Sequence, residues 1–98
     1  MGDRRFTIVC EFRGGTYVSQ LAADDERDAA RRWAEYLKRE RPIPRVSSYL
    51  AKSVAEELVG YPPVPFDGLS GVWCVTGNCG GNLMLANIIE SPSAGNRH

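Results

Sequence analysis

The chain has 98 residues, of which 43% are hydrophobic and 24% are charged. This length and composition predict a single globular domain over residues 1–90, followed by a flexible C-terminal tail at 91–98. Basic and acidic residues balance at 12 each, and a net charge of zero argues against strong electrostatic attraction to nucleic acid or to an anionic membrane. No apolar run is long enough for a signal-peptide core or a membrane span, so we expect a cytoplasmic protein.

Residues 5–22 predict a β-hairpin with Gly14-Gly15 as its two-residue turn. In that register Phe12 pairs with Tyr17 and Ile8 pairs with Leu21. Cross-strand partners share a face, so most bulky side chains gather on one side of the hairpin. That face holds Phe6, Ile8, Cys10, Phe12, Tyr17 and Leu21, and the opposite face holds Thr7, Val9, Glu11, Arg13, Thr16, Val18 and Gln20.

Two helices are expected in the middle of the chain. Residues 24–41 have an apolar stripe at helical spacing, begin at Asp24 or Asp25 as the cap, and end before two prolines. Ion pairs at i,i+4 spacing are expected for Asp28–Arg32, Arg31–Glu35 and Glu35–Arg39. Residues 47–59 form the second helix, with Ser47 or Ser48 as its cap and a left-handed Gly60 just past its end. Its buried rows are expected to be Leu50, Val54 and Leu58, and beside them Ala51, Ala55 and Val59.

The remaining chain predicts an extended connection and a second hairpin. Three prolines within Tyr61–Gly68 exclude a helix or a central strand there. A strand at 72–75, a loop at Gly77–Gly81 and a last strand at Leu83–Ile89 follow. The last strand is apolar on both faces, which is typical of a strand in the centre of a sheet.

These elements predict an α+β fold, a two-layer sandwich of order ββααββ with a four-stranded antiparallel sheet and both helices on one face. The second face of that sheet is then uncovered. It carries the polar and β-branched side of the first hairpin and one apolar set of the last strand, either Met84, Ala86 and Ile88 or Leu83, Leu85 and Ile89. We expect this face to bind a protein partner or a second copy of the chain, as a homodimer. The residues expected to bind it are Thr7, Val9, Glu11, Val18 and Gln20.

The cysteines are the first candidates for chemistry. A structural zinc site needs four ligands in closely spaced pairs, but the soft ligands beyond Cys74 and Cys79 are the isolated Cys10 and His98. A nucleophilic thiol needs a base, and the only histidine is His98. A reversible disulfide between Cys74 and Cys79 remains open beside the simpler interpretation as core and turn residues. We therefore expect no catalytic residue, no metal and no cofactor.

Three further patterns have simple structural interpretations. The glycine-rich segment Gly77–Asn82 lacks the following helix and the lysine of a phosphate-binding loop, so it predicts a turn. Residues 27–45 hold seven basic and three acidic side chains, which favours a solvated helix face and leaves nucleic-acid contact as an alternative. Trp33 and Trp73 are expected in the core, whereas Phe66 either covers the core or faces a partner.

No motif in the sequence specifies a reaction, so the leading hypothesis is a non-enzymatic protein-interaction module. A hairpin over 5–22 followed by an acid-capped helix is similar in architecture to small bacterial antitoxin and immunity proteins. That resemblance implies an inhibitor-type protein that binds a partner. The alternatives are a domain that contacts nucleic acid through residues 27–45 and a thiol-redox protein that uses Cys74 and Cys79.

Overall fold

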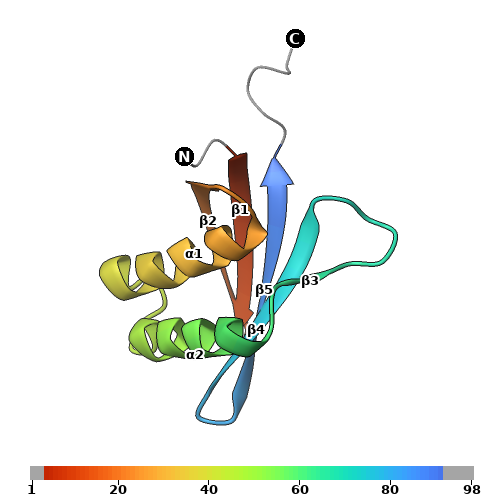
Figure 1. Ribbon diagram of the computed structural model, residues 1–98. Coiled ribbons are helices and arrows are strands. Elements are labelled where there is room, and N and C mark those ends of the chain that lie inside the picture. The colour runs from red at the N-terminus through yellow and green to blue at the C-terminus, as the bar shows by residue number, and fades with distance from the viewer. Residues whose placement is uncertain (1–3, 92–98) are drawn as a thin grey trace.

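The computed structural model describes residues 4–91, which form five strands and two helices. In chain order these are β1 (Arg4–Phe12), β2 (Gly15–Ala23), α1 (Glu26–Glu40), α2 (Ser47–Gly60), β3 (Val64–Pro65), β4 (Val72–Cys79) and β5 (Asn82–Ser91). The strands form one antiparallel sheet in the order β2-β1-β5-β4-β3, and both helices lie on one side of it (Figure 1). The two-layer α+β class is confirmed.

The expectation of four strands was wrong because the proline-rich segment adds a fifth. Val64 pairs with Cys74 and Pro65 pairs with Trp73, which makes β3 a two-residue strand at one edge of the sheet. Proline cannot donate a ladder hydrogen bond, but an edge strand has one side that needs no donor. The segment is extended, as expected, and its edge position lets it join the sheet.

The first hairpin forms with the expected faces, except for Arg13, and with a different register. Arg13 was expected on the outer side of the strand and lies in the turn instead. Its turn is Arg13-Gly14, with φ of 50° and 81°, so Phe12 pairs with Gly15 and Cys10 pairs with Tyr17. The pairing has moved by two residues from the expected one, and a shift of two keeps every side chain on its face. The Tyr17 ring lies over Gly15, where an added Cβ would be 2.8 Å from the Tyr17 hydroxyl oxygen. Gly15 therefore provides room for Tyr17 rather than a turn.

Helix α1 begins as its acidic start predicts. Asp25 is the cap, and its side chain accepts a hydrogen bond from the Asp28 amide at 2.8 Å. The helix ends at Arg41, which is left-handed with φ of 50°. The expected Asp28–Arg32 and Arg31–Glu35 ion pairs form at 2.9 and 3.0 Å. In place of the expected Glu35–Arg39 pair, Arg39 contacts the neighbouring Glu40 at 3.1 Å.

Helix α2 has the expected position but not the expected caps. Its N-cap is Val46, which makes no side-chain cap bond, and the Ser47 hydroxyl instead bonds both the amide and the carbonyl of Ile43 at 2.8 Å. Gly60 belongs to the helix, and the chain continues in an extended conformation at Tyr61. The row Leu50, Val54 and Leu58 is buried as expected. In the second row only Ala51 is buried, because Ala55 and Val59 point to solvent.

The second hairpin is longer than expected, and β5 is central. Its turn is Gly80-Gly81, both with positive φ, so β4 continues to Cys79 and β5 starts at Asn82. β5 lies between β1 and β4, which confirms the central position expected of a strand that is apolar on both faces. The side of Met84, Ala86 and Ile88 is buried beneath the helices. This settles which apolar set remains on the uncovered side.

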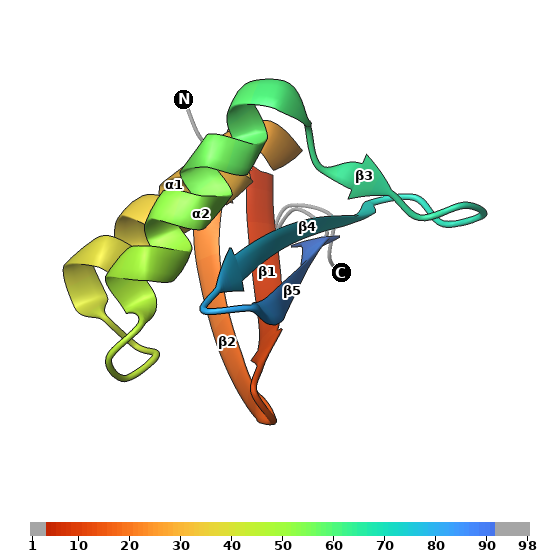
Figure 2. The ribbon, with the colours of Figure 1, turned by 90° about the horizontal axis from the view of Figure 1, so that it is seen from below.

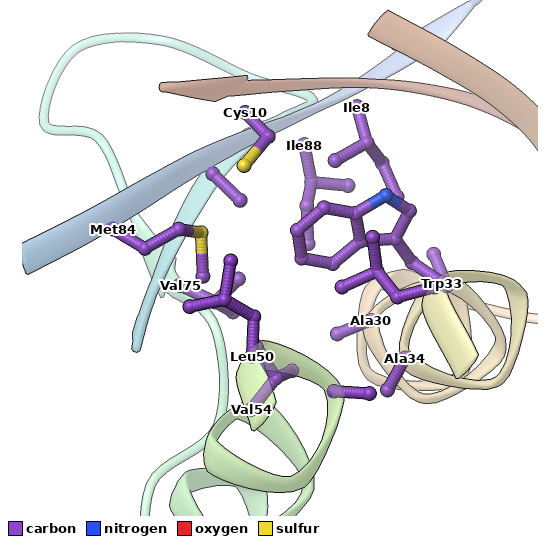
Figure 3. Packing of buried hydrophobic residues seen from close by; sticks show 14 of the residues in the cluster. Ile8, Cys10, Ala30, Trp33, Ala34, Leu50, Val54, Val75, Met84 and Ile88 are labelled. Carbon is purple, nitrogen blue, oxygen red and sulfur yellow. The ribbon is translucent and has the colours of Figure 1, made fainter. Parts of the chain in front are cut away.

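The core lies between the sheet and the helix pair (Figure 3). Trp33 of α1 projects between the strands and α2 and is 1% exposed, so its expected core position is confirmed. Trp73 is half-buried, and its ring centroid lies 6.2 Å from that of Phe6. Ser91 lies in β5, and the rest of the expected tail, residues 92–98, lies outside the described residues. Within residues 4–91, no helix has the length and apolar character that crossing a membrane requires.

Candidate partner-binding face

The side of the sheet opposite the helices is the main candidate surface, and we call it the outer face. Because β-strand side chains alternate, the residues on this face follow from the partners of the buried ones. Cross-strand rows run over it, such as Val18–Val9–Asn87–Cys74–Val64 and Thr16–Glu11–Leu85–Thr76. Neither helix covers this side, as the view from below also shows (Figure 2).

All five residues expected to bind a partner lie together on the outer face. Thr7, Val9 and Glu11 come from β1, and Val18 and Gln20 come from the neighbouring β2. The Gln20 side-chain amide donates to the Thr7 hydroxyl at 3.0 Å, and Val9 is directly opposite Val18. Val18 is 62% exposed. The structure therefore brings these residues into one continuous surface, and their role in binding stays a prediction.

The central strand adds the largest apolar side chains of the outer face. Leu83, Leu85 and Ile89 of β5 are all exposed, with Leu83 at 59%. Sequence reasoning left open whether this set or the opposite one would lie here. It did not include the contributions of β3 and β4, namely Val64, Val72, Cys74 and Thr76. The alternation of residues in β4 separates Val72 and Cys74 from Trp73 and Val75. Because both sets are apolar, the alternation does not indicate which set faces outward.

The cysteines do not form a site. Cys74 and Cys79 lie five residues apart on one strand, with side chains on opposite faces of the sheet. At the rise of an extended chain their Cα atoms are roughly 17 Å apart, whereas a disulfide needs less than about 7 Å. This separation excludes the disulfide within one chain that the sequence left open. Among the described residues no group of histidine, cysteine and carboxylate side chains gathers as metal ligands would, and His98 lies outside them.

Burial makes two of the thiols poor nucleophiles. Cys10 is fully buried in the core, and its removal from water, with a smaller effect of Glu11, raises the pKa of its thiol to about 12. Burial also raises the pKa of the Cys74 thiol. Both shifts favour the protonated form, which neither attacks an electrophile nor binds a metal. This is the opposite of what a reactive thiol requires.

The basic residues of segment 27–45 divide into two groups. Arg27 donates to the Leu58 carbonyl at 2.6 Å, and Arg31, Arg32 and Arg39 contact carboxylates of α1. Within residues 4–91, Lys38, Arg41 and Arg45 make no such contact. Arg45 lines a groove of about 350 Å³ that the first hairpin also borders; its residues are Phe12, Arg13, Tyr17, Ile43, Pro44, Arg45 and Val46.

A second groove, not expected from the sequence, lies between the helices. It has a volume of about 410 Å³ and a floor of small side chains, which are Ala34, Ala51 and Ala55. Arg31, Glu35, Lys38 and Lys52 stand around it. Ala55 was expected to be buried, so its exposed position here is the reason the groove was missed. The sequence signal for this groove was the presence of alanines on both helices, because such small side chains leave space between two packed helices.

The comparisons with known proteins leave the family open. Neither the models of protein families, nor the curated proteins, nor the solved structures gave a match to this chain.

Proposed function

We propose that the protein is a non-enzymatic protein-interaction module that binds through its outer face. The observation that supports this is the row of exposed apolar side chains on the uncovered side of the sheet, Leu83, Leu85 and Ile89. Antiparallel sheets tolerate one wet face, but that face is usually polar, because apolar surface in water is unfavourable. A partner that covers these side chains removes them from water.

The extent of the outer face suits a modest interface. The four long strands have 9, 9, 8 and 10 residues and lie side by side. At the usual strand rise and spacing they span roughly 600 Å². A stable specific interface buries about 800 Å² on each partner. Two further apolar side chains, Phe66 and Leu69, are exposed in the loop between β3 and β4. This loop lies at the β3 edge of the sheet. A partner that reaches them gains the missing area.

Two occupants of the outer face fit the proposal. One is a second copy of the chain, which gives the homodimer expected from the sequence. The other is a different protein, as for an inhibitor-, immunity- or antitoxin-type protein. Light scattering of the purified chain separates the two, since only the first raises the mass above the 10.8 kDa of the monomer.

Leu85→Glu tests the proposal. The substitution places a charge in the middle of the outer face, where the side chain is 40% exposed and contributes nothing to the core. We expect it to abolish self-association or partner binding while the circular dichroism spectrum stays unchanged. Val59→Glu is the matched control, because Val59 is 83% exposed on α2 and lies on the helix side. Equal binding by wild type and Leu85→Glu would refute the outer face as the binding surface.

A nucleic-acid contact is the second candidate, and the groove that holds Arg13 and Arg45 supports it. Both side chains lie beside Tyr17, and a base stacked on that ring would put its phosphates near the two guanidinium groups. Binding of mixed RNA and DNA oligonucleotides should then weaken steeply as salt rises. An Arg13→Gln, Arg45→Gln variant should bind more weakly with a flatter salt dependence. Absence of binding at low salt removes this candidate.

A thiol-redox function through Cys74 and Cys79 is the third and least supported candidate. It requires the two thiols to act separately or between molecules, given their separation on β4. Titration of thiol reactivity against pH tests it, because a redox-active cysteine has a depressed pKa. The burial of Cys74 shifts its pKa upward instead.

A further inference from the structure

The two edges of the sheet differ in how they are protected against additional strands. At the β4 edge, Pro62, Pro63 and Pro65 occupy the neighbouring segment and offer no backbone donor. Farther along that edge the Asn78 amide donates to the Ser53 hydroxyl of α2 at 2.9 Å. Prolines and side-chain caps of this kind are common devices that prevent edge-to-edge pairing. The β4 edge is therefore largely closed.

The β2 edge has no such device. Its nine residues contain neither a proline nor a charged side chain, and they pair with β1 in an unbroken register without a bulge. Because a two-residue turn is flanked by a hydrogen-bonded pair, Gly15 and every second residue after it bond to β1. The others, Thr16, Val18, Gln20 and Ala22, direct their amides and carbonyls outward. Within residues 4–91 these outward backbone groups have no hydrogen-bond partner.

A groove runs beside this open edge, between β2 and α1. It has a volume of about 260 Å³, and its walls are Ser19, Gln20, Leu21 and Ala22 on one side and Arg32, Glu35, Tyr36 and Arg39 on the other. The Ser19 hydroxyl oxygen, on the groove, is buried and has no hydrogen-bond partner. A buried hydroxyl without a partner is unfavourable, so a ligand that bonds it is stabilised.

The α1 wall of the groove also has free hydrogen-bond donors. Arg32 uses its Nε on Asp28 at 2.9 Å, and Arg39 uses its Nε on Glu40 at 3.1 Å. Their terminal nitrogens make no hydrogen bond within the described part of the chain. A guanidinium group carries five N–H donors, so each side chain can still bind a carboxylate. The ring of Tyr36 lines the same wall.

We propose that the β2 edge binds an extended peptide segment of another protein as an added strand. The outward amides and carbonyls of β2 supply the main-chain hydrogen bonds, and alternate side chains of the peptide enter the groove. A carboxylate at one of those positions pairs with Arg32 and Arg39. The two surfaces meet at β2, where the Val18 and Gln20 side chains point to the outer face. The added strand is bound instead by the β2 backbone and the α1 wall of the groove, so the inference does not rest on the proposed function.

A single strand fits this edge better than a second copy of the domain. Both views show the C-terminal half of α1 extending beyond β2 on the helix side (Figures 1 and 2). A second copy paired through its own β2 would bring its helices into the same layer, because cross-strand neighbours in one sheet keep the same face. An extended peptide has no helix layer and avoids this collision.

The probe is a phage-displayed library of random peptides about as long as β2, selected on the full chain. The enriched sequences should carry a carboxylate at a fixed position, and a synthetic peptide from them should bind in fluorescence anisotropy. Val18→Pro removes one outward amide and no bond to β1, so it should weaken binding by up to about tenfold, the upper range for the loss of one hydrogen bond. Val18→Thr, which keeps the amide and the β-branched shape, is the matched control and should bind as wild type does.

A second measurement does not depend on any variant. Bound peptide should slow hydrogen exchange at the amides of Thr16, Val18, Gln20 and Ala22 and leave those of Tyr17 and Ser19, already bonded to β1, unchanged. Arg39→Gln should reduce affinity for the acidic peptide and not for its amide analogue. The inference is overturned if no peptide is enriched or if the exchange pattern does not alternate. It is also overturned if wild type is a dimer that Val18→Pro dissociates and Leu85→Glu leaves intact, since a second copy then occupies the edge.

Discussion

Asp28 shows how one side chain stabilises several parts of the chain. Its carboxylate accepts the Asp24 amide at 2.9 Å and contacts both Arg31 and Arg32, so it ties the strand-to-helix connection to the first turns of α1. The Asp24 amide, followed by the two arginines, holds the pKa of Asp28 below its ordinary value of 3.8. The position near the start of a helix also favours a negative charge.

Asp28→Asn should therefore destabilise the fold at neutral pH by at most about 1 kcal/mol, the range of partly exposed ion pairs. The folded-state pKa lies below the unfolded one, so the contribution of the charge is complete above the ordinary pKa of aspartate. It is lost as the pH falls through the folded-state value, where wild type is protonated too. Thermal unfolding of both proteins checks this, and a stability difference that persisted in strong acid would contradict it.

Cys10 gives a second prediction at the scale of residues. Its thiol is fully buried and its pKa is raised to about 12, so in the native state it should not react with a thiol reagent near neutral pH. Cys74 and Cys79 are partly exposed and should react first. Counting modified cysteines by mass spectrometry against time, with and without denaturant, measures this. Fast reaction of Cys10 in the native protein would show that the core opens more readily than its packing indicates.

At the scale of elements, β5 shows the alternation that separates core from surface. Met84 is 0% exposed and lies under the helices, whereas its neighbour Leu83 is 59% exposed on the outer face. The two side chains have similar size and apolar character. Their residue types alone do not indicate which of the two is buried. The fold buries Met84 and exposes Leu83.

Met84→Ala should cost about 2–5 kcal/mol of folding free energy, because it removes buried atoms and leaves a cavity. Leu83→Ala should change it by less than about 0.5 kcal/mol, as at other exposed positions. Urea unfolding of both variants measures the difference. Similar losses would mean that Leu83 is buried in solution, as it would be in a stable homodimer across the outer face, so the same pair reports on assembly.

The first hairpin shows which parts of an element the sequence predicts. The two-residue periodicity identified both faces of β1 and β2 correctly, because burial of one face selects among registers that differ by one residue. It does not select among registers that differ by two. The geometry of the turn selects between those registers. With Arg13-Gly14 as the turn, Gly15 lies in the strand, where its missing side chain leaves room for the Tyr17 ring.

At the scale of the whole molecule, two helices cannot cover both sides of the sheet. The inner side is filled by Trp33, Met84, Ile88 and their neighbours, and the outer face remains in water (Figures 2 and 3). Exposed apolar surface on a folded protein attracts other apolar groups. This arrangement is why the outer face leads the proposed function.

A fluorescent apolar dye should therefore bind the native protein, and bind it on the outer face. We expect Leu85→Glu to reduce the dye signal clearly and Val59→Glu to leave it nearly unchanged, although Val59 is the more exposed side chain. The reason is that Leu85 shares the outer face with the exposed Leu83 and Ile89 of the same strand, whereas Val59 lies on the helix side. Equal reductions would place the dye elsewhere. A titration under native conditions makes the measurement.

Local patterns in the sequence were sufficient to predict most of the secondary structure and the class of fold. Turn glycines, helix-capping acids and apolar periodicity specified two hairpins around two helices, and the double-sided apolar pattern of the last strand placed β5 in the centre. These signals are local, because each depends on residues a few positions apart.

Three features became known from the packing of the elements and not from the sequence. One side of β5 meets the helices, β3 joins the sheet, and Ala55 and Val59 face water. The tertiary structure also kept Cys74 and Cys79 apart and left one long edge of the sheet open beside α1. Each of these outcomes depends on how separate elements meet. The packing between two layers is set by total shape and burial, which no short stretch of sequence contains.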